Sequence, residues 1–542
     1  MNSGGWRESR SARCSVPNLT NYTSYADAQR LFSTARLWEL FDGDREHLNI
    51  GYECVDRHAV PGRVALRVAH AEGRDEVIGF VELATWSSRF AHWLAAEGVQ
   101  QGDRVAIMLD PSLAFYAAMF GTVKRGAIAV PLFTLFGPDG VGLRTRDCAP
   151  QLLLTTPEKV AALASLNGVR VVAADHAFMA ALAHYPDRYE PQTTSGDLAI
   201  FQYTSGTTRE MPDAIKHTHR ALVVVMNAAL YGTGLRPGDR FFCPSSPAWG
   251  HGLWHGTLAP LALGIETGAY AGKFDAERLL QALQDYGTTN LSAAATHYRM
   301  TKNSGRVGDY RTTLRKLSFT GEPIDHDTLV FTQNAFGAPL CSMYGTTEVG
   351  VVLANYPGAE DFMVKQGSLG RPVPGVEVEV QRPDGARCLP NELGEIKVRR
   401  HGAWFPTKDR GRMDDDGYFY HAGRADDVII SAGWTMSAVE IENALVSHPA
   451  VHAAAVIGVP DALRGQVVKA FVVPVPGHAT DTAMMTEIQE FVRSRLSRHE
   501  FPRRIVFVAD LPRTPAGKIN RKALRDQEAV TTSDSSNQTE NA

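Results

Sequence analysis

A short polar stretch at Tyr203–His219 (YTSGTTREMPDAIKHTH) has the composition of a phosphate-binding loop. It follows an apolar, strand-like run and combines small hydroxyl side chains with a glycine, in the order Thr204, Ser205, Gly206, Thr207, Thr208. Backbone N–H groups and short hydroxyls in such a loop can hold phosphate oxygens, and glycine permits the tight turn. The same composition is typical of a solvated turn, and the spacing is not that of a GxxxxGK[ST] loop. Alone, the stretch predicts phosphate binding only weakly.

Four further stretches carry polar residues after strand-like or apolar segments. They are GEP at 321–323, YGTTE at 344–348, TKDRGR at 407–412 and PRTPAGKINR at 512–521. Each alone is typical of a turn. Together, in this order, they resemble the adenylate-forming superfamily of acyl-CoA synthetases and peptide-synthetase adenylation domains, over a range from about Asn49 to Leu524. The segment NIGYECVDRHA at 49–59 is similar to acetyl- and medium-chain acyl-CoA synthetases, which favours a coenzyme A ligase.

The resemblance implies a two-step reaction. A carboxylate attacks the α-phosphate of MgATP, pyrophosphate leaves and an acyl-adenylate forms; the thiol of coenzyme A then takes the acyl group. Both partners of the first step are anionic, so positive charge and fixed dipoles are needed. The expected small molecules are ATP, Mg²⁺, coenzyme A and a carboxylic acid. Two alternatives remain open: a stand-alone enzyme that loads a carrier-protein phosphopantetheine, and a degenerate adenylate-binding homologue without turnover.

The resemblance also implies roles for residues of the nucleotide site. Thr204–Thr208 would hold the β- and γ-phosphates, and Thr347 would contact the α-phosphate. Glu348 would help hold Mg²⁺, a hard cation that prefers oxygen ligands. The adenine pocket and the ribose would be bound by Gly321, Glu322, Pro323, Tyr344, Asp409 and Arg424.

Three residues near the C-terminus receive roles in the same way. Lys518 would reach both the α-phosphate and the attacking carboxylate, as a point charge on a flexible stem. Asp426 marks the expected hinge, about which the C-terminal domain rotates between the two half-reactions. Gly433 would let the pantetheine arm of coenzyme A approach closely, because glycine has no side chain.

The sequence departs from the family pattern in two places. Arg209 stands where a second glycine is expected, and Asp213 follows Pro212 where lysine is expected. Either Lys216 or Arg209 could supply the missing charge to the phosphates. Thr435 stands where coenzyme A synthetases often carry arginine. These departures keep the degenerate homologue open, whereas retention of the catalytic residue types at Glu348, Asp409, Arg424 and Lys518 argues against it.

The acyl pocket is expected between Ser246–Gly252 (SPAWGHG) and the residues around Tyr344. Acetyl-specific relatives carry tryptophan where this chain has Gly345, so Gly345 is expected to leave room for a larger acid. Trp249 and His251 are candidate walls with few polar groups. We therefore expect a medium-chain, branched or aromatic monocarboxylate, and expect Gly345→Trp to shift preference toward acetate or propionate.

Elements of an α/β fold must position these residues. Buried strands are predicted at Arg104–Leu109, Ala129–Leu132 and Gln151–Leu154, and an amphipathic helix at Val81–Glu97. Strands that alternate with helices favour parallel sheets with crossover helices. Shorter alternating runs separated by turn signals at 375–402 predict a small antiparallel sheet or barrel. The predicted fold is a large domain of two parallel α/β subdomains plus this barrel-like subdomain, followed by a small mobile α+β domain.

Composition and charge set the remaining expectations. The domains are a flexible arm at 1–25, the large domain at 26–425, the small domain at 426–525 and a disordered tail at 526–542. The net charge of −4 does not favour nucleic-acid binding. No apolar run is long enough to span a membrane, and the 6 scattered cysteines form no CxxC pair. We expect a cytoplasmic monomer or homodimer.

Overall fold

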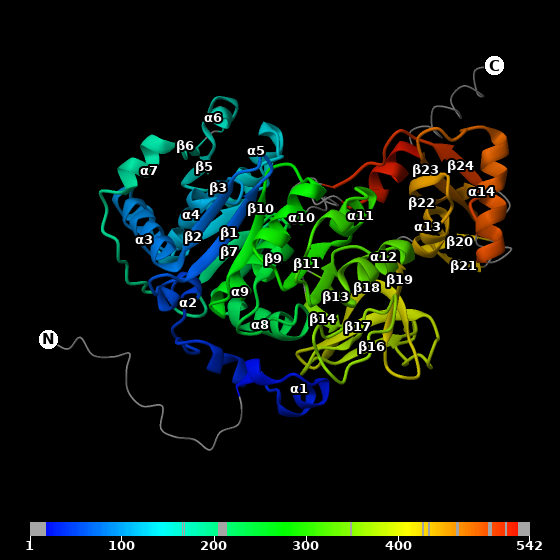
Figure 1. The fold of residues 1–542 in the computed structure, drawn as a ribbon, viewed down its shortest axis with the longest axis horizontal. Helices are drawn as coiled ribbons and strands as arrows, with labels where there is room; N and C mark the ends of the chain where they lie inside the picture. Colours follow the sequence, from blue (N-terminus) through cyan, green and yellow to red (C-terminus); the bar gives the residue numbers. More distant parts are fainter. Residues whose placement is uncertain are drawn as a thin grey trace.

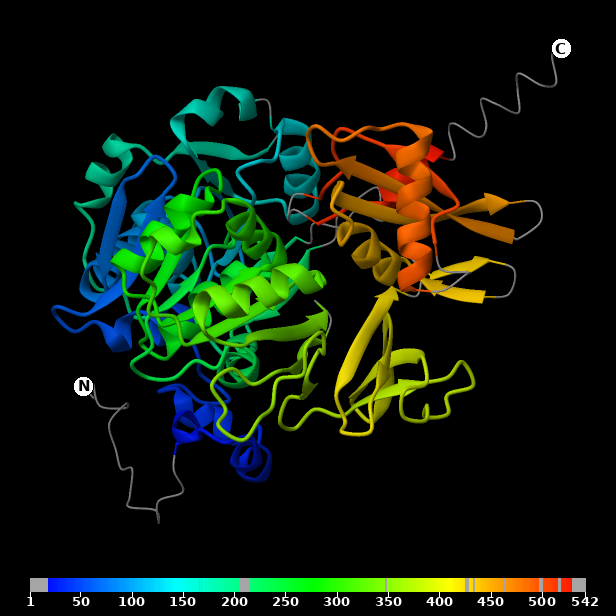
Figure 2. The ribbon, with the colours of Figure 1, turned by 45° about the vertical axis from the view of Figure 1, so that its right-hand side comes forward.

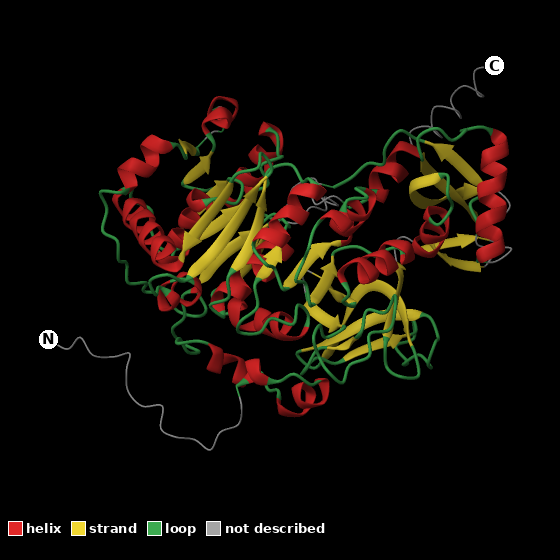
Figure 3. Cartoon of the chain, viewed as in Figure 1, coloured by secondary structure: helices red, strands yellow, loops and turns green. Residues whose placement is uncertain are grey.

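The computed structural model describes residues 18–164, 166, 168–203, 214–346, 349–424, 428–431, 434–461, 465–496, 501–514 and 518–528. Several predicted site residues lie outside these ranges: Thr204–Thr208, Arg209, Thr347, Glu348, Asp426 and Gly433. Figure 1 shows the described chain as a large body that holds the N-terminal and central segments, with the C-terminal domain at one side. Figure 3 shows helices packed around the strands of the large body.

The first sheet of the large domain is formed by apolar strands. Its order is β6 (Arg170–Ala173), β5 (Leu152–Thr155), β3 (Arg104–Met108), β4 (Ile128–Pro131), β7 (Leu198–Gln202) and β8 (Ile215–Thr218). The pairs are parallel except for the edge pair β7–β8, which is antiparallel. Strands β3, β4 and β5 are buried almost throughout, which explains their unbroken apolar runs. These strands and the helix α3 (Phe80–Ala96) confirm the prediction from the apolar pattern.

The second sheet carries the predicted site. Its order is β15 (Arg371–Pro372), β14 (Gly350–Ala354), β13 (Leu340–Thr346), β12 (Lys316–Thr320), β11 (Asn290–Ala294), β9 (Phe241–Cys243), β10 (Thr267–Ala271), β1 (Val64–His70) and β2 (Asp75–Gly79). The pairs from β13 through β12, β11, β9 and β10 to β1 are parallel. The carboxyl ends of β9, β11, β12 and β13 therefore lie along one edge, where α/β sheets commonly bind ligands.

Helices connect and cover the strands of the two sheets (Figure 3). The N-terminal part contributes α2 (Ile50–Cys54), α4 (Leu113–Lys124), α5 (Pro138–Cys148), α6 (Pro157–Leu163) and α7 (His176–Leu182). The central part contributes α8 (Ala221–Tyr231), the π-helix η4 (His251–Leu258), α9 (Ala259–Ala262), α10 (Ala276–Asp285), α11 (Ala295–Asn303) and α12 (His326–Phe336). Among the helices of the described ranges, none is long and apolar enough to cross a membrane.

A small antiparallel sheet follows, as the alternating runs predict. Its strands are β16 (Val378–Gln381), β17 (Gly394–Arg400), β18 (Ala403–Met413) and β19 (Phe419–Arg424), hydrogen-bonded in that order. Its inner face packs Val380, Ile396 and Val398 against Leu353 of β14, which joins it to the second large sheet.

The C-terminal domain has its own core of Ile429, Val456, Ala470 and Ile488 with their neighbours. It contains β20 (Val428–Ser431), β21 (Trp434–Ser437), α13 (Ala438–Val446), β22 (Val451–Asp461), β23 (Gly465–Pro474), α14 (Thr482–Arg495) and β24 (Arg504–Phe507). The predicted α+β composition of this domain is confirmed, and β20 and β21 form a hairpin. In Figures 1 and 2 the red segment after β24 returns from this domain to the large one.

The last residues of the expected N-terminal arm belong to the large domain. Residues 18–25 are packed against the large domain: Leu19 is 0% exposed and Tyr22 is 5% exposed. The helices η1 (Leu19–Asn21), α1 (Tyr25–Leu31) and η2 (Arg36–Leu40) follow one another here. The ring of Tyr25 meets that of Tyr356 at 4.8 Å. The predicted boundary at residue 25 is therefore wrong for these residues, because a few apolar side chains suffice to dock them.

Candidate active site

The loops that leave the carboxyl ends of β9, β11 and β12 meet around Glu322. Its carboxylate accepts a hydrogen bond from the Thr296 hydroxyl, and a guanidinium nitrogen of Arg299 lies 3.7 Å away. Gly321 has a φ of 96°, and a Cβ at this position would lie 2.7 Å from the Trp249 ring. Glycine is therefore required twice at position 321, by the backbone conformation and by the close approach of Trp249.

Tyr344 and Asp409 come from two different sheets and form a direct hydrogen bond. The Tyr344 hydroxyl donates to Oδ2 of Asp409 at 2.7 Å. Asp409, on β18, is 5% exposed, and its backbone N–H donates to the Thr407 hydroxyl at 3.2 Å. His421 lies across the sheet, with Nε2 3.6 Å from Oδ1 of Asp409. Two residues expected at the adenine and the ribose are thus side by side.

Lys518 reaches the large domain from the C-terminal segment. Its ammonium nitrogen lies 5.7 Å from the centroid of the Trp249 ring. A Cβ on Gly321 would lie 3.5 Å from Cε of Lys518. A short turn fixes the lysine: the Thr514 N–H donates to the Lys518 carbonyl at 2.8 Å, and Arg513 pairs with Ile519. The cation that the sequence predicts to be catalytic therefore lies beside the residues that the sequence assigns to adenine and acid.

Lys216 and Arg424 lie next to the predicted nucleotide residues along the chain. Lys216 is an exposed residue of β8 opposite Phe201 of β7, and its ammonium nitrogen is 5.3 Å from the Phe201 ring. Strand β7 ends just before the predicted phosphate loop. Arg424 ends β19 and is the partner of Asp409 in the register of β18 and β19. Their roles stay predictions.

His251 begins η4 and is almost fully enclosed. It is 4% exposed, with Nδ1 3.0 Å from the Ser245 hydroxyl and Nε2 2.8 Å from the Ser292 hydroxyl. Burial, with a smaller contribution from His255, lowers the pKa of His251 well below its usual value. The ring is therefore neutral near pH 7 and both nitrogens are engaged. It can form part of a pocket wall next to Trp249, whose ring is 5.3 Å away.

Gly345 is constrained by its neighbour strand. A Cβ at this position would lie 1.9 Å from the carbonyl oxygen of Gly350 on β14. The close approach of β14 therefore accounts for glycine at position 345, which the sequence interpretation, based on room for the acid, did not foresee. The pocket role of Gly345 stays a prediction.

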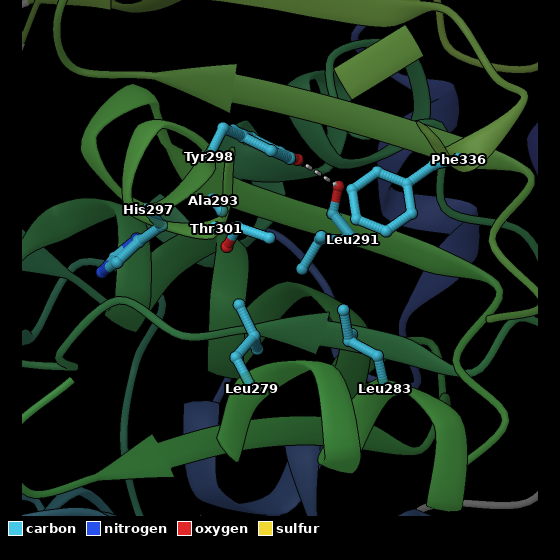
Figure 4. A pocket seen from close by; sticks show the side chains of 8 residues that line it. All are labelled: Leu279, Leu283, Leu291, Ala293, His297, Tyr298, Thr301 and Phe336. Carbon is cyan, nitrogen blue, oxygen red and sulfur yellow. Dashed lines mark hydrogen bonds between the residues drawn. The ribbon is translucent and has the colours of Figure 1, made fainter. Parts of the chain in front are cut away.

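An apolar pocket lies between α10, β11, α11 and α12, outside the predicted site (Figure 4). It is lined by Leu279, Leu283, Leu291, Ala293, His297, Tyr298, Thr301 and Phe336. The Tyr298 hydroxyl donates a hydrogen bond to the Leu291 carbonyl at 3.3 Å. Burial lowers the pKa of His297 to about 4. None of the predicted site residues lines this pocket.

Metal binding rests on Glu348, which lies outside the described ranges. Within those ranges, no three His, Cys, Asp or Glu side chains are gathered so as to hold a metal ion. The predicted Mg²⁺ contact therefore stays a prediction.

Sequence reasoning did not single out four polar side chains near the segment Ser246–Gly252: Gln202, His217, Trp254 and His255. Gln202 is the last residue of β7 and is 3% exposed. The one signal in the sequence is a glutamine at the end of an otherwise apolar strand, LAIFQ. Which residues surround this glutamine could not be inferred from that signal.

Comparison with known proteins identifies the family. The model of the AMP-binding enzyme family matches residues 55–404, and that of the AMP-binding enzyme C-terminal domain matches residues 440–518. The chain is 31% identical over 520 residues to acetyl-coenzyme A synthetase of Bacillus subtilis, covering 88% of this chain and 90% of that protein.

Solved structures agree with this match. An acyl-CoA synthetase of Brucella canis aligns with a TM-score of 0.73 and 32% identity, over 94% of this chain and all of the other (100%). An anthranilate CoA ligase in complex with anthranoyl-AMP aligns with a TM-score of 0.80 and 26% identity, over 90% of this chain and 98% of the other. The chain therefore belongs to the AMP-binding enzyme family, in its acyl-coenzyme A synthetase branch, and is an AMP-forming, ATP-dependent acid:CoA ligase.

Proposed function

We propose that this ligase activates a medium-chain, branched or aromatic monocarboxylate. The observation that carries the proposal is the contact of Lys518 with Trp249 beside Gly321. It joins the cation needed for adenylation to an aromatic side chain at the acid end of the site. Trp249 and the neutral His251 offer little that would bind a second charge, which supports a monocarboxylate.

The chemistry needs a cation between two anions. A carboxylate oxygen attacks the α-phosphorus of ATP, the bond to the pyrophosphate oxygen breaks, and the acyl-adenylate forms. Lys518 would stabilise the negative charge that accumulates on the α-phosphate oxygens, and would draw the carboxylate to the same place. The coenzyme A sulfur then attacks the acyl carbon, AMP leaves and the thiol proton passes to solvent. Mg²⁺, bound with ATP, would neutralise phosphate charge.

The adenosine would be held by the bonded pair of Tyr344 and Asp409. A carboxylate can accept hydrogen bonds from both ribose hydroxyls, and these charge-assisted bonds are strong in a buried setting. The hydroxyl of Tyr344 holds the Asp409 carboxylate in place, which leaves the tyrosine ring to stack on the base. Gly321–Pro323 would form the other side of the adenine pocket.

The size of the acid is supported by the relatives and by the residue types at the acid end. The structural relatives include a ligase for anthranilate, a ring-bearing acid, and the family also contains a ligase named for acetate. This chain lacks the tryptophan that acetyl-specific enzymes carry at the position of Gly345. A ring or a medium-length chain therefore fits the expected pocket better than acetate does.

A panel of carboxylic acids tests the proposal. AMP release is measured with and without coenzyme A, and ATP–pyrophosphate exchange is measured in parallel. We expect acids with medium chains, branches or rings to give AMP release that requires coenzyme A, with higher kcat/KM than acetate. A preference for acetate would contradict the proposed acid class. ATP–pyrophosphate exchange without any transfer of the acyl group to coenzyme A would point to a carrier-protein acceptor. The absence of exchange with every acid would favour a homologue without turnover.

A further inference from the structure

Three buried polar atoms close to the predicted acid end of the site have no hydrogen-bond partner among the residues that the structure describes. They are Nε2 of Gln202, Nε2 of His217 and Nδ1 of His255. Two of these side chains contact Trp254: its indole N–H donates to Oε1 of Gln202 at 3.1 Å, and its ring lies 4.8 Å from that of His217. His255 lies 6.2 Å, ring to ring, from His251. Buried polar atoms without partners are rare and costly, so their grouping needs a cause.

The orientation of Gln202 defines what it can bind. The indole nitrogen of Trp254 is only a donor, so the glutamine must turn its oxygen toward it. The amide nitrogen of Gln202 is thereby left as a donor with no partner within the described ranges. Gln202 is 3% exposed, so water at the surface does not reach this donor. The group that completes it must be an acceptor, such as an oxygen.

Gly250 shows which part of the chain the Gln202 amide faces. A Cβ built on Gly250 would lie 3.4 Å from Oε1 and 3.7 Å from Nε2 of Gln202, so the amide faces the backbone at a position that has no side chain. Gly250 follows Trp249, whose ring contacts Lys518. The donor therefore lies beside the segment Ser246–Gly252, which is predicted to line the acyl pocket.

The surroundings favour a neutral partner. Burial alone lowers the pKa of both His217 and His255 to about 4, so both rings are neutral near pH 7. Each imidazole can donate or accept at its unpaired nitrogen, depending on its tautomer. A second carboxylate or an ammonium group would be buried here without a counter-charge, which is costly. A hydroxyl or carbonyl group carries no such cost.

We propose that the acid carries a neutral oxygen substituent, a hydroxyl or a carbonyl, which accepts a hydrogen bond from Gln202 and is also read by His255 or His217. This inference rests on the proposed function, because it deepens the choice of acid at the same site. A site built to hydrogen-bond a substrate hydroxyl discriminates strongly against the analogue without it, since the buried groups are then left unpaired.

Matched acids test the proposal in the wild-type enzyme. ATP–pyrophosphate exchange is measured for butyrate, hexanoate and benzoate, each beside its hydroxy and oxo derivatives. At least one derivative should exceed its parent acid in kcat/KM by about tenfold to a hundredfold. If every derivative is used no better than its parent, the unpaired atoms bind water and the inference is wrong, although the proposed ligase function stands. No exchange with any acid would overturn the proposed function and this inference together.

Two glutamine variants assign the preference to Gln202. In Gln202→Met the ratio of kcat/KM between derivative and parent should fall to about one, mainly through a higher KM for the derivative. Gln381→Met is the control: Gln381 is 4% exposed on β16, far along the chain, and donates to Glu379 at 3.1 Å. It should keep the wild-type ratio. An unchanged ratio in Gln202→Met would overturn the assignment.

Discussion

The residues predicted to bind the nucleotide and those predicted to bind the acid are built into the fold in different ways. On the nucleotide side, ionisable side chains from distant segments come together: Tyr344 with Asp409, and Lys518 from the C-terminal domain. On the acid side, neutral side chains lie deep around one helix, η4, and the end of β7. Bound phosphates and ribose require charge and strong hydrogen bonds whatever the acid, whereas the acid is selected by shape and by a few neutral polar groups.

The residues of the nucleotide side can therefore be tested by removing charges, and those of the acid side by comparing acids. Variants on the nucleotide side should change the rate or the use of ATP for every acid alike. Variants on the acid side should change the ranking of acids or the stability of the fold. A variant that affects both ATP use and the ranking of acids would contradict this difference.

The largest effect is expected for Lys518→Ala. The adenylation rate should fall by about a hundredfold or more, because the charge on the α-phosphate loses its stabilising cation. ATP binding, measured by calorimetry, should remain largely intact, and the loss should be similar for all acids. The control is Lys522→Ala, since Lys522 is exposed and pairs with Asp526 at 2.7 Å. Near-normal pyrophosphate exchange in Lys518→Ala would remove this lysine from the mechanism.

Asp409→Asn should raise the KM for ATP by about tenfold to a hundredfold. The amide keeps the shape but loses the charge that strengthens hydrogen bonds to the ribose, and such bonds contribute about 1.5–3 kcal/mol. The KM for the acid should change little. Asp384→Asn, at an exposed turn, is the matched control. A change in the ranking of acids, with KM for ATP unaltered, would break the division between the two sides.

Acid pH should destabilise the fold through the buried histidines. The folded-state pKa of His255 is lowered to about 4, below the ordinary value of 6.5, so the unfolded chain takes up a proton first as pH falls. Above pH 6.5 the ring is neutral in both the folded and the unfolded state. As pH falls from about 6.5 to 4, the unfolded chain is protonated first, and the free energy of unfolding decreases. From pH 7 to pH 5 the loss is about 1–2 kcal/mol for one such histidine.

Urea unfolding at both pH values measures this loss. His255→Gln should lose less stability on acidification than wild type, whereas His452→Gln, which removes an exposed histidine of the C-terminal domain, should behave as wild type. Buried Glu53 and Asp56, whose pKa values are raised by burial, act in the opposite direction in all three proteins, so the comparison between variants cancels them. Equal losses in His255→Gln and wild type would show that His255 is not kept neutral.

A last effect on stability, similar in size to that of acidification, is expected for Gly345→Ala. The free energy of unfolding should fall by about 1–3 kcal/mol, because the added methyl would meet the Gly350 carbonyl and force β14 to shift. Gly308→Ala is the control, since a Cβ there meets nothing within 4 Å. An unchanged unfolding midpoint in Gly345→Ala would show that β14 yields, and would return Gly345 to its role as the residue that leaves room for the acid.

The predictions from the sequence succeeded where the signal is local. Strands such as β3 and β5 were found because apolar runs report burial directly, and helix α3 was found by the spacing of its apolar residues. The family was found because several short polar stretches occur in the order typical of it, whereas the roles of those residues at the nucleotide stay predictions. The packed start of the chain at Leu19 was missed, since a single apolar residue in a polar segment has no period to detect.

The sequence alone determined the family and the fold class, and it predicted which residues bind the nucleotide. Only the tertiary structure decided which groups face one another. Gln202 and Trp254 are on separate elements, β7 and η4, and the hydrogen bond between them orients the amide. Likewise Gly345 is constrained by Gly350 across a strand pair rather than by open space. Contacts between segments that are distant along the chain depend on how the sheets pack, and residue type and spacing do not carry that information.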